Sequence, residues 1–398
     1  MKRLAILDGY FHWPPAGGGI RDIAEVANGL SNQYEVTLIC PAYGFRGRVD
    51  RSEELEFEVR KISFDIVSFN GPTVLRRFRS EIDDIEPDMI MVGNGNVMKP
   101  FMIKACEGIR TWVRLYSYEL LCPVSHGLLF DGKRVCESNY TDAYLTCMRC
   151  WLRHPKRSAY NHETMRSMSV LPVAYRRNLL ESLEIPESFI VTSKYMERRY
   201  GEIIEPDRLV RIPSGIDRGR FLSGDSSDSG LTRIFAAGRV SDPAKGIGTL
   251  IDAAENLWTE RQDFLLEIAG HDVSLPERDY MHPLGWVPEE RLPGAYASSD
   301  IVVVPSVWAE PFGLVALEGM GSGKPVVASR AGGLQDFVID GMNGRLFEPG
   351  DSAQLTEILS ELIDSPATRR RMGLRGLSTA EKYDWKKIIS QYARLLEG

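Results

Sequence analysis

The chain lacks any long apolar segment. None of its hydrophobic runs approaches the roughly 18 residues that a membrane-spanning helix needs, although 43% of the residues are hydrophobic. Lys2 and Arg3 precede only the apolar run 4–7, which is too short for the hydrophobic segment of a signal peptide. We therefore expect a cytoplasmic protein without a membrane-spanning part.

Two short motifs that would direct the chemistry are also missing. No Asp-x-Asp occurs anywhere, so a metal-chelated diphosphate has no evident ligands. The glycine run Gly17, Gly18 and Gly19 does not complete the dinucleotide fingerprint, because a third glycine at the expected spacing and an acidic residue after a second strand are absent. The chain therefore does not have the motif of a dinucleotide-dependent oxidoreductase.

The charge of the chain is acidic but unevenly distributed. A pI of about 5.6, without a basic motif interleaved with aromatic residues, argues against nucleic acid as a partner. Residues 104–177 nevertheless hold 12 Lys and Arg against 6 Asp and Glu, Arg149 and Arg153 among them. This is either a solvated surface of mixed charge or a patch that attracts anionic lipid headgroups or a lipid-pyrophosphate acceptor. In the second case the protein would be peripheral to the inner membrane surface.

The length of 398 residues exceeds what one hydrophobic core usually fills, so two domains are expected. Short apolar runs alternate with helical patterns in both halves, which predicts an α/β fold of two doubly wound, Rossmann-like domains. The predicted strands are 4–7, 35–40, 89–92, 189–192, 209–212, 233–237, 264–269, 301–304 and 326–329, and the predicted helices are 21–30, 73–85, 248–260, 313–320 and 385–396.

The segment 301–324 carries two carboxylates around a turn that should open a helix. Residues 301–304 read as a buried strand closed by Pro305, so Glu310 lies in the following loop and Glu318 in the next helix. The backbone amides of Phe312, Gly313 and Leu314 would lie at the electropositive helix N-terminus, where a phosphate binds well. Carboxylates accept hydrogen bonds from hydroxyl groups, so a sugar joined to a phosphate is the expected ligand.

These residues resemble glycosyltransferase family 4, whose signature pairs two glutamates with seven residues between them. The likeness extends over nearly the whole C-terminal half and more loosely over the N-terminal half. The residues that carry it are Gly238, Arg239, Lys245, Gly246, Gly285, Trp286, Val287, Pro288, Gly332 and Gly333, and in the first half Gly17–Gly19 and residues 213–217.

The resemblance implies a GT-B fold, in which the two domains face each other across a cleft. We place an N-terminal acceptor-binding domain at 1–222, with a cysteine-rich insertion near 122–157, and a polar linker at 223–232. A C-terminal domain at 233–378 would bind the nucleotide sugar. The helix in 379–398 would cross back to the first domain.

The resemblance also implies a retaining transferase that moves a hexose from a UDP- or GDP-linked sugar to a glycan, lipid-linked or small-molecule acceptor. Glu310 would contact the hexose, Glu318 the ribose, and Arg239 with Lys245 the leaving diphosphate, without a catalytic metal or other cofactor. Gly238, Gly18 and Gly19 would border the donor, and backbone groups of Val287 would read the base. Trp286 is either part of this site or part of the core.

One departure concerns the group that touches the sugar or the acceptor. The family often has a histidine where this chain has Tyr116, followed by Tyr118 and Glu119. Any of these three residues, or none, serves in place of the histidine. Two other functions stay open: a nucleotide-sugar epimerase of the same fold, and a non-catalytic subunit that binds a nucleotide sugar.

Four of the six cysteines lie within 29 residues: Cys122, Cys136, Cys147 and Cys150. Thiols at this spacing in a cytoplasmic protein favour a structural zinc site, and an iron–sulfur cluster uses the same ligands. Disulfides and unligated thiols are the remaining alternatives. Residues 131–157 show no clear periodicity, so we expect a loop-rich insertion that a metal would hold together.

Overall fold

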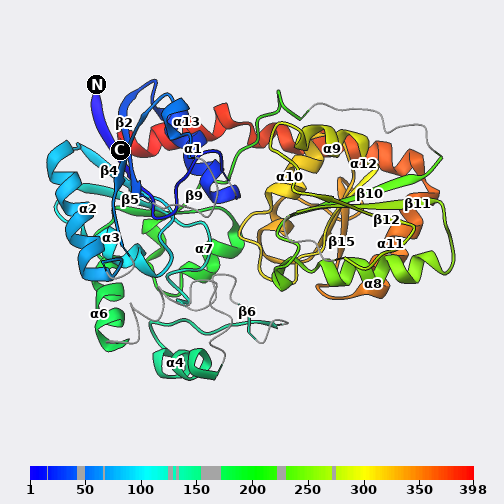
Figure 1. Cartoon of the computed structure of the whole chain (residues 1–398), viewed down its shortest axis with the longest axis horizontal. Helices are drawn as coiled ribbons and strands as arrows, with labels where there is room; N and C mark the ends of the chain where they lie inside the picture. Colours follow the sequence, from blue (N-terminus) through cyan, green and yellow to red (C-terminus); the bar gives the residue numbers. More distant parts are fainter. Residues whose placement is uncertain are drawn as a thin grey trace. The chain divides into compact units, whose positions relative to one another are not determined.

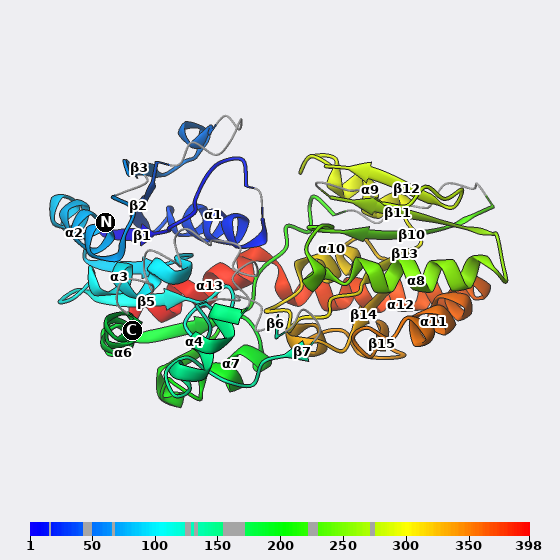
Figure 2. The same cartoon turned by 60° about the horizontal axis from the view of Figure 1, so that its bottom comes forward.

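The computed structural model describes residues 1–15, 17–42, 50–65, 68–123, 129–130, 134–153, 172–221, 230–270 and 275–398. The chain divides into two compact units (Figures 1 and 2). The first consists of Met1–Leu128, Cys136–Pro213 and Ile389–Gly398, and the second of Leu129–Val135 and Ser214–Ile388. Each unit is built around a parallel sheet of its own.

The first unit has a seven-stranded sheet in the order β3-β2-β1-β4-β5-β8-β9, in which every pairing is parallel. Its central strands are short apolar runs buried on both faces, as a parallel sheet covered by helices requires. The strands are β1 (Lys2–Leu7), β2 (Tyr34–Pro41), β3 (Glu58–Ile62), β4 (Met89–Val92), β5 (Arg110–Arg114), β8 (Ser188–Val191) and β9 (Leu209–Arg211).

Helices connect these strands, and two of them begin at a side-chain cap. The Asn70 side chain accepts a hydrogen bond from the Thr73 amide at the start of α2, and the Ser193 hydroxyl accepts one from the Met196 amide at the start of α7. The helices are α1 (Gly18–Leu30), α2 (Gly71–Ile85), α3 (Lys99–Lys104), α6 (Pro172–Leu183) and α7 (Lys194–Tyr200), with short 3-10 turns η1 (Ser52–Glu54), η2 (Asn96–Met98) and η4 (Pro206–Arg208).

The cysteine-rich insertion lies between β5 and α6. It contains an antiparallel pair, β6 (Leu129–Phe130) and β7 (Arg134–Val135), and the helix α4 (Tyr144–Arg153). The expectation of a segment without periodic structure at 131–157 is therefore wrong for α4. This helix exposes Leu145 and Leu152 and keeps Cys147 and Cys150 partly buried, so its inner face lacks the aliphatic residues that reveal a helix in a sequence.

The second unit has a six-stranded parallel sheet in the order β12-β11-β10-β13-β14-β15. The strands are β10 (Thr232–Ala237), β11 (Phe264–Ala269), β12 (Met281–Gly285), β13 (Ile301–Val304), β14 (Val326–Ser329) and β15 (Gly344–Phe347). The helices are α8 (Ile247–Trp258), α9 (Leu292–Ser298), α10 (Leu314–Gly321), α11 (Ser352–Asp364) and α12 (Pro366–Ala380), with 3-10 turns η5 (Pro243–Lys245), η6 (Gly332–Asp336) and η7 (Glu381–Tyr383). Most of the predicted linker, 223–232, lies outside the described residues, and β10 begins at Thr232.

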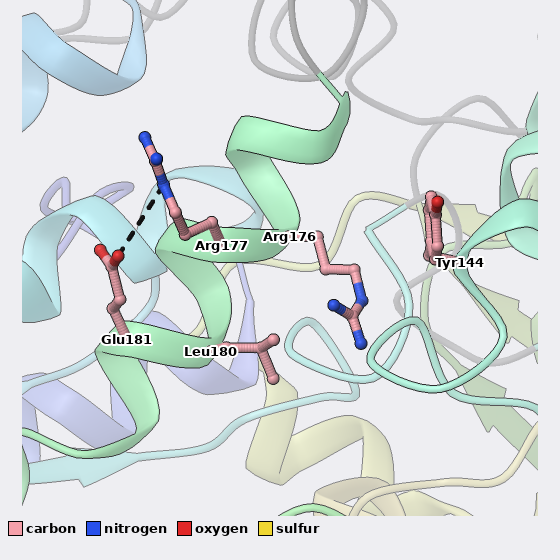
Figure 3. A pocket seen from close by; sticks show the side chains of 5 residues that line it. All are labelled: Tyr144, Arg176, Arg177, Leu180 and Glu181. Carbon is pink, nitrogen blue, oxygen red and sulfur yellow. Dashed lines mark ion pairs between the residues drawn. The ribbon is translucent and has the colours of Figure 1, made fainter.

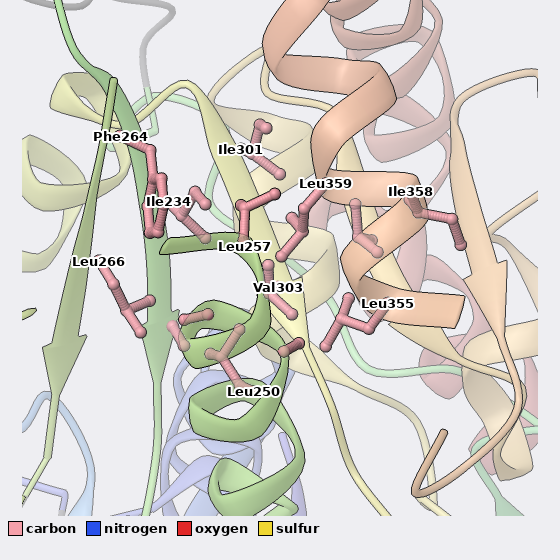
Figure 4. Packing of buried hydrophobic residues seen from close by; sticks show 14 of the residues in the cluster. Ile234, Leu250, Leu257, Phe264, Leu266, Ile301, Val303, Leu355, Ile358 and Leu359 are labelled. Atoms are coloured by element: carbon pink, nitrogen blue, oxygen red, sulfur yellow. The ribbon is translucent and has the colours of Figure 1, made fainter. Parts of the chain in front are cut away.

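Both faces of this second sheet are buried. Ile234 of β10 packs with α8 and α11, whereas its neighbour Phe235 packs with α9 and α10, because successive residues of a strand point to opposite faces. Figure 4 shows the first of these clusters, in which Leu250 and Leu257 of α8 and Leu355 and Leu359 of α11 lie over the sheet. The predicted pair of doubly wound α/β domains is therefore confirmed.

The last helix, α13 (Trp385–Glu397), begins in the second unit, and its residues from Ile389 onward belong to the first unit. There the Tyr392 ring centroid lies 5.6 Å from the Arg114 guanidinium, and Gly29 of α1 faces Ile389 with no room for a side chain. Within the described part of the chain, no helix combines the length and the apolar character needed to cross a membrane.

Candidate functional site

The loop between β13 and α10 holds Glu310 in a fixed position. The Glu310 carbonyl accepts a hydrogen bond from the Gly333 amide at 2.7 Å. Gly332 has a φ of 56°, and a Cβ atom there would collide with the backbone of Glu310, so this close approach requires glycine. Glu310 is buried, so its carboxylate is not a solvent-exposed loop charge.

Lys245 and Glu310 form an ion pair, with 2.6 Å between Lys245 Nζ and Glu310 Oε1. The same carboxylate oxygen accepts a hydrogen bond from the Ser306 hydroxyl at 2.8 Å, and Lys245 Nζ lies 4.6 Å from the centroid of the Trp308 ring. Burial alone would raise the pKa of Glu310, but the charge and hydrogen bond of Lys245, together with the hydrogen bonds of Trp308 and Ser306, hold this pKa below its usual range. The carboxylate is therefore ionised near neutral pH.

The loop that carries Lys245 is packed directly on the loop after β13. The Val307 amide donates to the Ala244 carbonyl at 2.9 Å, and Gly246 has a φ of 64° where a Cβ atom would collide with the Pro305 carbonyl. The Lys245–Glu310 pair therefore joins two segments whose backbones are already in contact.

Arg239 lies on the same loop but faces solvent. Its side chain is 68% exposed and pairs with Asp242 at 2.9 Å, while the other Asp242 oxygen caps the Ala244 amide. Gly238 has a φ of 149°, and no atom lies within 4 Å of the position of a Cβ. A ligand can therefore approach the backbone of Gly238 and the guanidinium of Arg239 with little rearrangement.

Glu318 is placed on α10, where it is only 5% exposed, so it is not a solvated helix residue. The Tyr296 hydroxyl donates a hydrogen bond to Glu318 Oε2 at 2.7 Å. Tyr296 is itself fixed by edge-on contacts with the rings of Phe221 and Phe235. The sequence analysis missed Tyr296, because nothing in the local pattern of residues 292–298 connects it to a residue 22 positions further on.

Phe312, Gly313 and Leu314 lie at the start of α10, and each has a different structural role there. Gly313 is the N-cap of the helix with a φ of 110°, a conformation that favours glycine. The Phe312 side chain is buried against Phe337 and Tyr383, so it belongs to the core of the second unit. Leu314 is the first helical residue, so its amide belongs to the electropositive N-terminal turn.

The predicted base-reading segment follows β12. Gly285 has a φ of 64°, and Trp286 after it is 47% exposed, so the alternative that Trp286 is a core residue is wrong. Val287 packs against the core cluster that contains Tyr296 and Phe312. An exposed indole beside a fixed backbone is a suitable surface for an aromatic base.

In the first unit, the glycines that open α1 lie beside Asn94 and Tyr116. Gly18 is the first residue of α1, and a Cβ atom on Gly19 would be 3.0 Å from Asn94 Oδ1 and 3.4 Å from the Tyr116 ring. The Tyr116 hydroxyl donates to Asp22 at 2.9 Å, and Asp22 also pairs with the buried Arg114 at 3.3 Å. Sequence reasoning missed Asn94, which follows β4 at the carboxyl edge of the sheet.

Tyr118 and Glu119 are turned into the interior of the first unit. Tyr118 is fully buried and stacks on Tyr200, and Glu119 pairs with the buried Lys99 at 2.5 Å while accepting from Ser117. Both side chains therefore take part in the internal packing of the first unit. Of the three residues expected on the acceptor side, the structure brings only Tyr116 next to the glycine loop.

Asp8 at the end of β1 is a buried carboxyl that the sequence analysis did not single out. It accepts hydrogen bonds from the amides of Tyr10 and Asn94, both at 2.9 Å, and from the Asn94 side chain at 2.7 Å. Burial outweighs these hydrogen bonds and raises the pKa of Asp8 to about 6.

The four clustered cysteines carry thiol side chains that are partly buried. Cys136 and Cys147 direct their sulfur atoms to the carbonyls of Ser138 and Asn139, respectively. Among the residues that the structure describes, no group of three or more His, Cys, Asp or Glu side chains is already assembled as a metal site.

Figure 3 shows a cavity of about 240 Å³ in the first unit, beside the insertion. Tyr144 of α4 lies on one side of it, and Arg176, Arg177, Leu180 and Glu181 of α6 lie on the other. None of the predicted donor or acceptor residues lines this cavity. It is therefore separate from the chemistry that the sequence predicts.

Comparison with known proteins identifies the domain in the second unit. Residues 232–365 match the family Glycosyl transferases group 1, so a glycosyltransferase domain is present there. The MMP alpha-(1->4)-mannosyltransferase of Mycolicibacterium hassiacum is 31% identical over 226 residues, which cover 54% of this chain and 54% of that protein. The D-inositol 3-phosphate glycosyltransferase of an Arthrobacter species is 34% identical over 208 residues, 46% of this chain and 48% of that protein. The chain thus spans about half the length of these curated relatives.

Solved structures resemble the chain over its whole length. Sucrose-phosphate synthase from Thermosynechococcus elongatus superposes with a TM-score of 0.75 at 18% identity, covering 100% of this chain and 98% of that chain. HepE from Anabaena, solved with UDP and glucose, superposes with a TM-score of 0.71 at 19% identity and covers 100% of both chains. At these identities the likeness shows the fold, and it confirms the predicted GT-B fold class.

We predict that Asp8 makes stability depend on pH. Because the folded pKa of about 6 lies above the ordinary value of 3.8, the folded protein holds a proton that the unfolded chain has released, so Asp8 lowers stability as the pH rises from about 4 to above 6. Asp8→Asn does not titrate. The stability of the wild type relative to this variant should therefore fall by roughly 3 kcal/mol over that range.

Unfolding by urea at a series of pH values measures this difference. A difference between wild type and Asp8→Asn that stays constant from pH 4 to pH 7 would show that Asp8 titrates normally.

Proposed function

We propose that the protein is a retaining glycosyltransferase of family 4, which transfers a hexose from a UDP- or GDP-linked sugar to a glycan, lipid-linked or small-molecule acceptor. The observation that carries the proposal is the Lys245–Glu310 pair of 2.6 Å. It lies within the glycosyltransferase domain and beside the N-terminus of α10. A cation, an ionised carboxylate and a helix N-terminus in one loop system suit a sugar that is leaving a diphosphate.

The donor would bind the second unit through groups of three kinds. Glu310 accepts hydrogen bonds from the hexose hydroxyls, and Glu318 accepts them from the ribose. The amides of Phe312, Gly313 and Leu314 face the sugar and the phosphate at the start of α10. Val287 contributes its backbone to the base, and Gly238 lets the chain approach the donor closely.

The leaving diphosphate needs positive charge, because negative charge grows on it in the transition state. Arg239, at 68% exposure, is free to turn toward it as a fork of donors, and Lys245 serves as a point charge. Since the chain contains no Asp-x-Asp, we assign this neutralisation to protein cations and the α10 N-terminus, and we propose catalysis without a metal ion.

Retention follows if the acceptor attacks from the face that the diphosphate leaves. The bond from the anomeric carbon to the phosphate oxygen breaks, and the acceptor oxygen bonds to the same carbon. The acceptor proton passes to an oxygen of the departing diphosphate. The protein then holds and orients the reactants and needs no nucleophile of its own.

The acceptor would bind the first unit near Gly18 and Gly19, which by the resemblance also border the diphosphate of the donor. Asn94 and Tyr116 lie beside this loop, and the buried Asp22 and Arg114 hold the Tyr116 ring in place. Similar proteins support a nucleotide-sugar donor: HepE was solved with UDP-glucose, and several relatives are named mannosyltransferases. We further propose that the enzyme works in the cytoplasm, where nucleotide sugars are made.

A panel of nucleoside diphosphate sugars in a thermal-shift assay tests the donor. A ligand that binds only the folded protein raises its melting temperature. We expect stabilisation by a UDP- or GDP-linked hexose, lost in Glu318→Ala, and glycosyl transfer lowered at least about 100-fold in Arg239→Met/Lys245→Met. Arg370→Met, which changes an exposed arginine of α12, is the matched control and should keep full activity.

Each contrary outcome has a distinct meaning. An isomerised donor in the absence of any acceptor would identify an epimerase, and donor binding without transfer to any acceptor class would identify a binding subunit. Unchanged turnover in Arg239→Met/Lys245→Met would contradict the role given to these cations.

Tyr296→Phe tests how Glu318 is held. The change removes the hydroxyl that donates to Glu318 while keeping the packed ring, so the nucleoside diphosphate should bind about 5- to 10-fold more weakly. Inorganic pyrophosphate, which lacks the ribose, should bind as before. Tyr280→Phe, a buried tyrosine of the other core cluster, is the control. Equal loss for both ligands in isothermal titration would assign Tyr296 to the fold alone.

A further inference from the structure

The described part of the insertion that follows β7 buries few apolar side chains. Among residues 135–150, Tyr140 is the only buried hydrophobic side chain, although the segment includes most of α4. A segment with so little buried apolar surface needs a cross-link, such as a metal ion or a disulfide, to keep one conformation. The same segment, together with Cys122 just before it, holds four of the six cysteines of the chain.

Backbone hydrogen bonds bring three of the cysteine-bearing segments together. The Tyr140 amide donates to the Leu121 carbonyl at 2.8 Å, which sets the residue before Cys122 against the loop after β7. Cys147 Sγ lies 3.9 Å from the carbonyl of Asn139 in that same loop, and Cys136 Sγ lies 4.0 Å from the carbonyl of Ser138. Three cysteine-bearing segments therefore meet at one short loop.

The position of the fourth cysteine, Cys150, follows from the geometry of helix α4. Cys147 and Cys150 are three residues apart on α4, so they share one face of the helix. The exposed Leu145 and Leu152 lie on another face, which leaves both cysteines on the partly buried side. The spacing of a Cys-x-x-Cys on a helical turn is typical of two ligands to one metal ion.

Two arginines hold the backbone of the loop that follows β7. Arg199 donates to the carbonyls of Cys136 and Glu137 at 3.0 and 3.3 Å. Arg176 donates twice to the carbonyl of Thr141 at 2.9 and 2.6 Å, and its guanidinium lies 5.4 Å from the centroid of the Tyr144 ring. The backbone around Cys136 and the Tyr140 loop is therefore held by contacts that do not involve the sulfur atoms.

A divalent cation placed among the four sulfur atoms would stabilise their thiolate forms, because its charge offsets the mutual repulsion of the thiolates.

We propose that Cys122, Cys136, Cys147 and Cys150 bind one zinc ion as tetrahedral thiolate ligands, and that this ion fastens α4 to the loops after β5 and β7. Zinc accepts four thiolates without a preference for another geometry, and such closed sites are structural. The sulfur atoms close on the metal by leaving the carbonyls of Ser138 and Asn139. This site is independent of the proposed glycosyl transfer.

Cys40 and Cys106 provide the contrast within the same chain. Both are buried among aliphatic residues in the sheet and helices of the first unit, where burial raises the pKa of each thiol well above its ordinary value. They behave as small apolar side chains and take no part in the site.

Metal analysis of the purified full chain tests the proposal. Elemental analysis by mass spectrometry should find about one zinc ion per chain in the wild type, and at least about tenfold less zinc in Cys147→Ser/Cys150→Ser. Cys40→Ala, the control, should keep its zinc. Cobalt exchanged into the wild type should show the thiolate-to-cobalt charge-transfer absorption of a tetrahedral sulfur site, which is a readout separate from enzyme activity.

The wild type alone can overturn the proposal, so it does not depend on whether the variants fold. Absence of zinc with four thiols open to a thiol reagent would contradict it, as would iron with inorganic sulfide or disulfide bonds among these cysteines. Zinc retained in Cys147→Ser/Cys150→Ser would place the metal elsewhere.

Discussion

The candidate donor site depends on one partly buried ion pair, between Lys245 and Glu310. The two residues lie far apart in the sequence. Lys245 comes from the loop after β10 and Glu310 from the loop after β13, and both loops leave the carboxyl edge of the same sheet. An ionised carboxylate is costly to bury unless a cation compensates it, so Lys245 permits Glu310 to stay charged beside Ser306 and Trp308. In the proposed function, the lysine assigned to the leaving phosphate is thus also the residue that keeps the Glu310 carboxylate ionised.

Parallel strands explain why the remaining groups collect nearby. In a doubly wound sheet the loops after adjacent strands emerge at one edge, and ligands bind there. Gly246 and Gly332 allow these loops to touch at points where any side chain would collide with backbone, and Gly313 starts α10. In the first unit the same edge carries Asp8, Asn94 and the Gly18–Gly19 loop. In both units, polar groups therefore collect at the carboxyl edge of the parallel sheet.

Sequence patterns predicted what depends on local residues. The strands β4, β11, β13 and β14 have the predicted bounds, because each is a short apolar run rich in aliphatic residues between polar neighbours. Helix α4 was missed because cysteines replace aliphatic residues on its inner face. The burial of Glu119 depends on Lys99, and the orientation of Glu318 on Tyr296; such pairs form only when distant segments fold together, so spacing could not reveal them.

A double-mutant cycle on Lys245 and Glu310 tests the central claim most directly. The free energy of unfolding of the second unit would be measured for the wild type, Lys245→Met, Glu310→Gln and the combination, without ligand. If the pair holds the two loops together, the single changes are not additive and the coupling is about 1–3 kcal/mol. Additivity within about 0.5 kcal/mol would mean that the two side chains act independently, and the account of the site would be wrong.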